Sequence, residues 1–136
     1  MIDSLARKYL KKKGLDFPHG TGHGVGYFLN VHEGPIAISK GYKIKLKPGH
    51  VISNEPGFYK KGKFGIRIEN MIYVKQIKSK VFFENLTMVP IDKELINFNL
   101  LNKKEKNYLL NYNLRIYSNL EKYLNYKEKF WLLSQF

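Results

Sequence analysis

The spacing of apolar residues predicts helices at both ends of the chain. In residues 1–13 apolar positions recur at helical spacing, and lysines gather at the end of the run, where cations suit the helix dipole. Gly14 is expected to stop this helix. Residues 103–124 carry a second apolar stripe, which should cover one face of a sheet. The stripe consists of Leu110, Leu114, Ile116, Tyr117, Leu120, Tyr123 and Leu124.

Runs of β-branched and aromatic residues, separated by glycine and proline, predict strands between the two helices. The expected strands are residues 26–32, 51–54, 66–75 and 81–89, with a loop over 36–46. Alternation along residues 66–75 places Arg67 and Glu69 on one face of their strand. Residues 126–136 should add one or two helical turns, docked by Phe130, Trp131 and Leu132. The pattern as a whole predicts an α+β fold.

Length and composition limit the classes of protein that fit. The 136 residues are enough for one domain with its own core. There is no cysteine, which excludes disulfides and thiolate zinc sites. The first residues lack the apolar core of a secretory signal, and no apolar run approaches the roughly 18 residues that span a bilayer. A cytoplasmic protein without a membrane segment is therefore expected.

The formal net charge of +13 raises the question of a nucleic-acid partner. Arginine occurs only at positions 7, 67 and 115, so lysines spread along the chain supply the excess. Scattered lysines are more typical of a solvated surface than of an RNA or DNA interface, which combines arginine with exposed aromatic residues. A nucleic-acid partner is not expected, and a basic module that binds RNA or protein remains an alternative.

The segment FPHGTGHGVGYFLNVHEGP, residues 17–35, holds three of the four histidines. Its glycines do not have the G-x-G-x-x-G spacing of dinucleotide-binding folds. His19 and His23 share only their spacing with the H-E-x-x-H zinc motif, because Gly20 replaces the glutamate and two glycines oppose a helix. His19 and His32 each remain open to a structural role, and His50, after a Pro-Gly turn, is expected to be structural.

A histidine and two glutamates form a candidate metal-binding set: His23, Glu55 and Glu69. Neutral imidazole and carboxylates suit Zn²⁺, Mn²⁺ or Co²⁺. Glu55 and Glu69 lie in two extended runs, VISNEPGFY and GIRIEN, and antiparallel pairing would bring both carboxylates to one face. Each glutamate alone remains open to a surface role or an ion pair, which for Glu69 would be with Arg67.

The three segments, in this order and spacing, resemble aminopeptidase P, the Xaa-Pro aminopeptidases of the pita-bread metallopeptidase fold, related to prolidase. The resemblance continues through ENLT and VPID, residues 84–87 and 89–92. It implies part of a pita-bread fold, with a curved antiparallel sheet and covering helices. It also implies a metal-dependent peptidase that releases an N-terminal residue preceding proline. A prolidase-like dipeptidase is the nearer enzymatic alternative.

The resemblance also implies residue roles at a site with two divalent ions, of which manganese is expected and zinc or cobalt are alternatives. His23 would bind one ion, Glu55 would bind metal and help to move protons, and Glu69 would bridge both ions. His19 and His32 would not bind metal; they would hold the substrate and stabilise the tetrahedral intermediate. A single arginine, Arg67, would orient the carboxylates. The substrates would be peptides with proline at the second position.

One departure from this family pattern concerns two metal-binding aspartates expected before the first histidine. The only aspartates there, Asp3 and Asp16, match neither the spacing nor the surroundings of that pair. Residues 1–136 therefore resemble the C-terminal portion of a catalytic domain, without its first half and without an N-terminal domain. The alternatives are a chain that needs a complementing N-terminal partner or self-association, a piece of a longer active protein, and a non-catalytic binding remnant.

Overall fold

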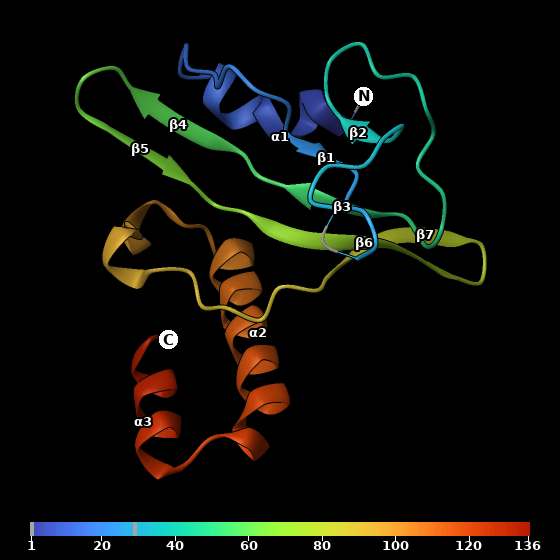
Figure 1. The fold of residues 1–136 in the computed structure, drawn as a ribbon. Helices are drawn as coiled ribbons and strands as arrows, with labels where there is room; N and C mark the ends of the chain where they lie inside the picture. The colour runs from blue at the N-terminus through green and yellow to red at the C-terminus, as the bar shows by residue number, and fades with distance from the viewer. Residues whose placement is uncertain (1, 29) are drawn as a thin grey trace. The chain divides into compact units, whose positions relative to one another are not determined.

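The computed structural model describes residues 2–28 and 30–136 (Figure 1). It divides into two compact units, Met1–Thr87 and Met88–Phe136. Helices and antiparallel sheets together confirm the mixed α and β class. Within the described ranges, no helix is long and apolar enough to cross a membrane.

The described part of the first unit, residues 2–28 and 30–87, contains one helix and three small antiparallel sheets. The helix is α1 (Ile2–Lys11). The largest sheet has the order β3-β6-β7, a second sheet is the β4-β5 hairpin, and a third pairs β1 with β2. The strands are β1 (Gly22–His23), β2 (Ala37–Ile38), β3 (Val51–Asn54), β4 (Gly57–Lys60), β5 (Phe64–Arg67), β6 (Asn70–Ile77) and β7 (Lys80–Asn85).

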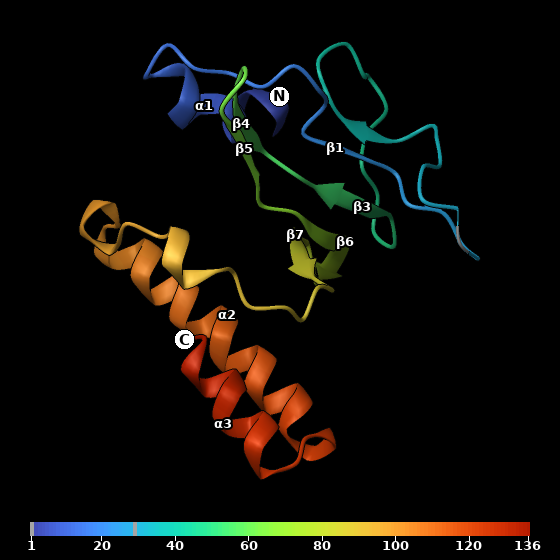
Figure 2. The same cartoon turned by 60° about the vertical axis from the view of Figure 1, so that its left-hand side comes forward.

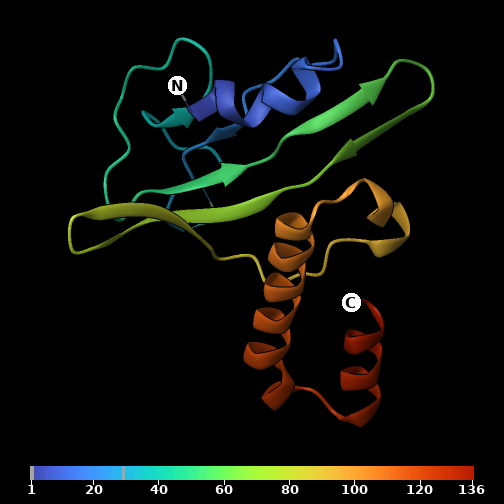
Figure 3. The same cartoon turned by 180° about the vertical axis from the view of Figure 1, so that it is seen from behind.

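The two glutamates of the candidate set lie in a break between two ladders of one long hairpin. Figure 3 shows the β4-β5 hairpin continuing the line of β3 and β6. The lower ladder ends with Asn54 opposite Asn70, and the upper ladder begins with Gly57 opposite Arg67. The same register, carried across the break, sets Glu55 opposite Glu69. The sequence prediction of one unbroken strand over residues 66–75 is therefore wrong, because the ladder stops at these two glutamates.

The apolar core of the first unit is small and lies beneath β3 and β6. Its buried members are Ile38, Ile52 and Ile72, with Ile36 and Leu46 packed against them. Burying one such side chain stabilises a fold by about 1.5–3 kcal/mol. Helix α1 contributes differently from its predicted apolar face: it buries Asp3 and Arg7, while Leu5 is 66% exposed.

Residues 26–32 do not form the predicted strand, and Leu29 lies outside the described residues. The chain instead folds back on itself: the Gly26 N–H donates to the Asn30 carbonyl at 2.7 Å, and the Glu33 N–H donates to the Gly24 carbonyl at 2.9 Å. This return requires glycine, because a Cβ at Gly24 would lie 2.0 Å from the Glu33 carbonyl oxygen. The true strand in this region is β1, a few residues earlier.

The second unit is helical. Its elements are η1 (Lys93–Leu95), η2 (Phe98–Leu100), α2 (Lys103–Leu120), η3 (Glu121–Tyr123) and α3 (Tyr126–Ser134). Capping boxes, Asn102 with Glu105 and Asn125 with Glu128, satisfy the first turns of α2 and α3. The two long helices lie side by side (Figure 2).

The buried face of this unit matches the predicted stripe in part: Ile116 is buried, and Tyr117, Leu120 and Leu124 pack against it. Its core consists of Tyr112, Ile116 and Leu132. Leu110 and Leu114 are exposed, because α2 turns the face of Ile116 towards α3. Leu132 is buried as expected, but Phe130 and Trp131 are exposed, so their predicted docking role is wrong. The prediction that α2 covers a sheet stays a prediction.

Candidate active site

His23 and Glu55 come together across the end of β3. Strand β1 carries His23, and its backbone N–H donates to the hydroxyl of Ser53 at 2.9 Å. The same hydroxyl donates to Glu55 Oε1, also at 2.9 Å, and Ser53 is fully buried. Glu55 is 8% exposed, and its Oε1 lies 3.5 Å from His23 Nε2. One buried serine thus holds both the backbone of His23 and the side chain of Glu55.

The second ring nitrogen of His23 indicates which nitrogen is free. Nδ1 lies 2.8 Å from the Gly24 carbonyl oxygen, which can only accept a hydrogen bond. In the neutral ring Nδ1 is therefore the donor, and Nε2 presents a lone pair. That lone pair lies beside a carboxylate oxygen of Glu55, so two acceptors lie close together. This donor set fits a divalent cation, since metal-binding histidines commonly donate their other N–H to a carbonyl.

Arg67 neutralises the other oxygen of Glu55 and joins it to Tyr59. Its Nη1 lies 3.1 Å from Glu55 Oε2, and its Nε donates to the Tyr59 hydroxyl at 2.8 Å. The hydrogen bond to Tyr59, and the nearby negative charges, raise the pKa of Arg67 above its ordinary value. Among the described residues Arg67 forms its salt bridge with Glu55, whereas the alternative that gave Glu69 no site role had paired Arg67 with Glu69.

His19 is held at both ring nitrogens. Nδ1 lies 2.7 Å from the Gly20 carbonyl oxygen, and Nε2 lies 2.7 Å from the Tyr59 hydroxyl. In the neutral ring Nδ1 must then be the donor and Nε2 the acceptor from Tyr59. His32 reaches the site differently: its ring lies against the ring of His23, with centroids 4.0 Å apart. All three histidines of the glycine-rich segment therefore border one site.

Glu69 is the candidate residue that the structure leaves apart. It is exposed, and only the register of the hairpin sets it opposite Glu55. Over residues 2–28 and 30–136, no three His, Asp or Glu side chains lie close enough together to hold a metal ion.

Sequence reasoning missed Ser53 and Tyr59. Tyr59 links His19 to Arg67, and Ser53 links His23 to Glu55. Both lie inside the quoted segment VISNEPGFY, two residues before and four residues after Glu55. A signal for Ser53 was its place beside Val51 and Ile52 in a short strand, because a serine that is buried with apolar neighbours needs a polar partner. The role of Tyr59 depends on the β4-β5 pairing. The sequence argument used the antiparallel pairing of these two runs only to bring the carboxylates together, and it assigned no role to Tyr59.

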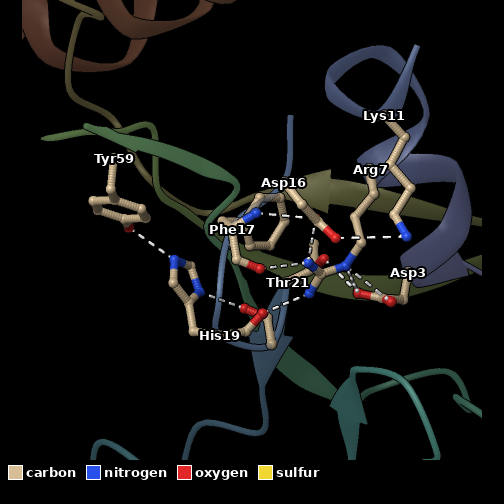
Figure 4. Close-up of polar contacts among 9 residues, drawn as sticks. Asp3, Arg7, Lys11, Asp16, Phe17, His19, Thr21 and Tyr59 are labelled. Carbon is tan, nitrogen blue, oxygen red and sulfur yellow. Dashed lines mark hydrogen bonds and ion pairs between the residues drawn. The ribbon is translucent and has the colours of Figure 1, made fainter. Parts of the chain in front are cut away.

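The two upstream aspartates belong to a separate polar cluster. Arg7 binds Asp3 through Nε at 2.9 Å and Asp16 through Nη1 at 2.7 Å (Figure 4). Their carboxylates therefore balance an arginine. This agrees with the sequence argument that neither aspartate matches the expected metal-binding pair. His50, expected to be structural, accepts the Lys47 N–H at Nδ1 within a turn.

Comparison with known proteins defines the class of this fold and site. Metallopeptidase family M24 matches residues 1–76, and the C-terminal region of peptidase M24 matches residues 80–135. The chain belongs to metallopeptidase family M24.

Among its relatives, the probable Xaa-Pro aminopeptidase P of Botryotinia fuckeliana is 53% identical over 128 residues, covering 86% of this chain and 20% of the relative. The X-prolyl aminopeptidase of Caenorhabditis elegans, a cytosolic enzyme with a di-nuclear active site, matches with a TM-score of 0.87 and 42% identity. That match covers 98% of this chain and 24% of the solved chain. A prolidase from Pyrococcus furiosus matches with a TM-score of 0.55 and 39% identity, covering 63% of this chain and 24% of its own. The chain thus spans about a fifth to a quarter of the length of these proteins.

Proposed function

We propose that this chain is the C-terminal portion of the catalytic domain of a metal-dependent aminopeptidase that releases an N-terminal residue preceding proline. The single observation that carries the proposal is the juxtaposition of His23 Nε2 and Glu55 Oε1, 3.5 Å apart, with Arg67 on the other carboxylate oxygen. Membership of family M24 and relatives named Xaa-Pro aminopeptidase P support it. The substrates are peptides with proline at the second position.

His23, Glu55 and Glu69 are the residues that would hold metal. Imidazole nitrogen and carboxylate oxygen suit Mn²⁺, Zn²⁺ or Co²⁺, and we propose two ions, with manganese first. The di-nuclear site named for the Caenorhabditis elegans enzyme supports the number two. When bound, such ions lower the pKa of water and polarise a peptide carbonyl.

The other polar residues would orient the reacting groups. Ser53 and Arg67 each fix one oxygen of Glu55, so this carboxylate is directed before any ligand arrives. This fixed carboxylate would accept and return a proton during hydrolysis. His19, held by Tyr59, and His32, against the His23 ring, would contact the peptide and the oxyanion that develops at its carbonyl.

The remaining metal-binding groups would come from chain outside residues 1–136 or from a complementing or second chain. An apolar cavity of about 680 Å³ in the first unit supports a missing packing partner. Exposed Ile44, Val81 and Phe83 line it. Patches of this kind favour association. The cytosolic relative supports a cytoplasmic location for the whole protein.

The first test is hydrolysis of a fluorogenic Xaa-Pro peptide by the 136-residue chain, with Mn²⁺ and with a chelator. The same assay is run after adding a separate chain that supplies the upstream half of an M24 catalytic domain. We expect chelator-sensitive turnover in the complemented sample. Glu69→Ala should abolish both turnover and metal loading, while Glu94→Ala, an exposed glutamate of the second unit, should retain them. Full activity in the Glu69 variant would overturn the assignment.

A prolidase-like dipeptidase is the second candidate, favoured by the match to the Pyrococcus furiosus prolidase. The match to the X-prolyl aminopeptidase covers nearly the whole chain, including the second unit, and therefore favours the first candidate. Substrate length separates the two. Cleavage of Xaa-Pro dipeptides without cleavage of Xaa-Pro-Yaa peptides would establish the dipeptidase.

A further inference from the structure

Arg7 is a nearly buried arginine whose hydrogen bonds join helix α1 to the segment just before His23. It is 9% exposed on α1, and three of its nitrogens make hydrogen bonds. Nε donates to the Asp3 carboxylate, Nη1 to Asp16 Oδ1 and the Phe17 carbonyl, and Nη2 to the His19 carbonyl at 2.5 Å (Figure 4). One guanidinium thus joins the helix to the backbone that carries His19.

The carboxylates around Arg7 are themselves fixed. Asp3 is 4% exposed and also accepts the Thr21 hydroxyl at 2.7 Å, from just before β1. Asp16 accepts the Phe17 N–H at 2.9 Å and lies 3.5 Å from the ammonium of Lys11. The cluster therefore contacts both sides of His19 in the sequence, at positions 17 and 21.

A second route from Arg7 to His19 passes through an aromatic ring. The guanidinium carbon lies 3.9 Å from the centroid of the buried Phe17 ring, and that ring lies 4.9 Å from the His19 ring. A guanidinium stacked on an aromatic face fixes the orientation of that face. The Phe17 ring in turn limits how the His19 imidazole can rotate.

We propose that Arg7 is a positioning residue for His19. By holding the His19 carbonyl and the Phe17 ring, it keeps His19 in the orientation in which Nδ1 donates to Gly20 and Nε2 accepts from Tyr59. Arg7 acts on the site through His19. The consequence for peptide hydrolysis rests on the proposed function, but the positioning itself does not.

The planar fork of arginine is essential to this role. Asp3, Asp16 and two carbonyl oxygens lie around Arg7 in directions that one guanidinium matches. Lysine keeps the charge but offers a single nitrogen and no flat face for Phe17. Arg7→Lys therefore removes the geometry while preserving the electrostatic balance with the two carboxylates.

The test is the tautomer of His19, observed by ¹⁵N NMR of the histidine rings in the 136-residue chain without metal or peptide. His19→Gln identifies the His19 signals. We expect the Nδ1–H pattern in the wild-type protein and its loss, in favour of a mixture of tautomers, in Arg7→Lys. Arg115→Lys, a matched change in the second unit, should leave the pattern unchanged.

Thermal unfolding of the same samples separates positioning from general stabilisation. A folded Arg7→Lys protein that retains the wild-type His19 tautomer would overturn the proposal, whatever its unfolding temperature. Should this variant not fold, Asp16→Ala carries the test, because it removes a half-exposed partner of Arg7 and leaves the buried Asp3 in place. We expect a partial shift of the His19 signals there, and an unchanged spectrum would equally overturn the proposal. The His19 tautomer is measured without metal or peptide, so this result does not depend on whether the peptidase assay succeeds.

Discussion

The first unit contains two polar clusters that differ in the balance between their hydrogen-bond donors and acceptors. Around Arg7, one guanidinium meets two carboxylates and two carbonyls, and Thr21 uses a remaining acceptor position of Asp3. Around Glu55, Arg67 pairs with one carboxylate oxygen, while the other faces Ser53 and the Nε2 lone pair of His23. The first cluster has its donors and acceptors matched within the chain, whereas the second has an excess of acceptors.

This difference distinguishes a structural cluster, around Arg7, from a cluster around Glu55 that a cation would complete. A buried charge that keeps all its hydrogen bonds holds the backbone in one place. Two acceptors 3.5 Å apart gain from a cation between them, which the described residues do not supply. Arg7 of the matched cluster also holds the His19 carbonyl. The matched cluster therefore helps to position a histidine that borders the unmatched cluster.

Breaking the matched cluster should have the largest effect on stability. Arg7→Met leaves the buried carboxylate of Asp3 without its cation, and we expect unfolding to become easier by about 3–5 kcal/mol. Denaturant titration followed by circular dichroism measures this change. Lys8→Met, one position along the same helix and exposed, should change stability by no more than about 0.5 kcal/mol. Equal effects of the two substitutions would contradict the distinction between the clusters.

Completing the unmatched cluster should stabilise the chain. Mn²⁺ at 100 times its dissociation constant is expected to add about 2.7 kcal/mol, because the ion binds only the folded state. Denaturant unfolding with and without the metal measures this gain. The gain should disappear in His23→Gln and persist in His50→Gln, whose histidine lies in a turn. A gain that survives the His23 substitution would place the ion elsewhere.

Ser53 belongs to the unmatched cluster, but its hydroxyl both accepts and donates a hydrogen bond within the chain. Ser53→Ala removes the acceptor for the His23 N–H and the donor to Glu55, and leaves a backbone donor without its partner. We expect a loss of about 1–3 kcal/mol and weaker Mn²⁺ stabilisation. Ser118→Ala, on the exposed side of α2, is the control in the same denaturant titration. A loss without any change in the manganese response would show that Ser53 supports only the fold.

The unmatched cluster could be predicted from sequence more fully than the matched one. Three short segments rich in glycine, proline and apolar residues indicated His23, Glu55 and Glu69. The expected antiparallel pairing of the two glutamate-bearing runs is present on both sides of the glutamates. The Arg7 cluster left no such signal. Helical periodicity placed Leu5 inward, whereas the helix buries Asp3 and Arg7, which pair with each other and have further partners nine to eighteen residues away. Periodicity reports local amphipathicity and cannot identify a partner at that separation.

The prediction of a strand over residues 26–32 was wrong for a related reason. Its aromatic and β-branched residues favour strands, but the return from Gly24 to Glu33 depends on two close backbone approaches that only glycine permits. Propensity describes the side chains, whereas the glycines determine the path.

The smallest expected effect is the pH dependence of the matched cluster. The hydrogen bond from Arg7, followed by that from the Phe17 N–H, lowers the pKa of Asp16 below its ordinary value. A carboxyl whose folded pKa is lowered contributes stability above its unfolded pKa, and this contribution is lost as pH falls through the folded pKa. Asp16→Asn should therefore be less stable than the wild-type protein at neutral pH, and the difference should vanish in acid.

Lys75 provides a contrast of opposite sign. The hydrogen bond with Glu84 raises its pKa, so its contribution is full below the ordinary lysine pKa and is lost as pH rises through the raised value. Urea titrations of wild type, Asp16→Asn and Lys75→Met from acid to alkaline pH measure both differences. Both side chains are partly open to solvent, so salt should weaken both effects. If the stability difference between Asp16→Asn and the wild-type protein persists undiminished in acid, the Asp16 carboxylate does not balance the charge of Arg7. The cluster around Arg7 would then not be matched in the sense used above.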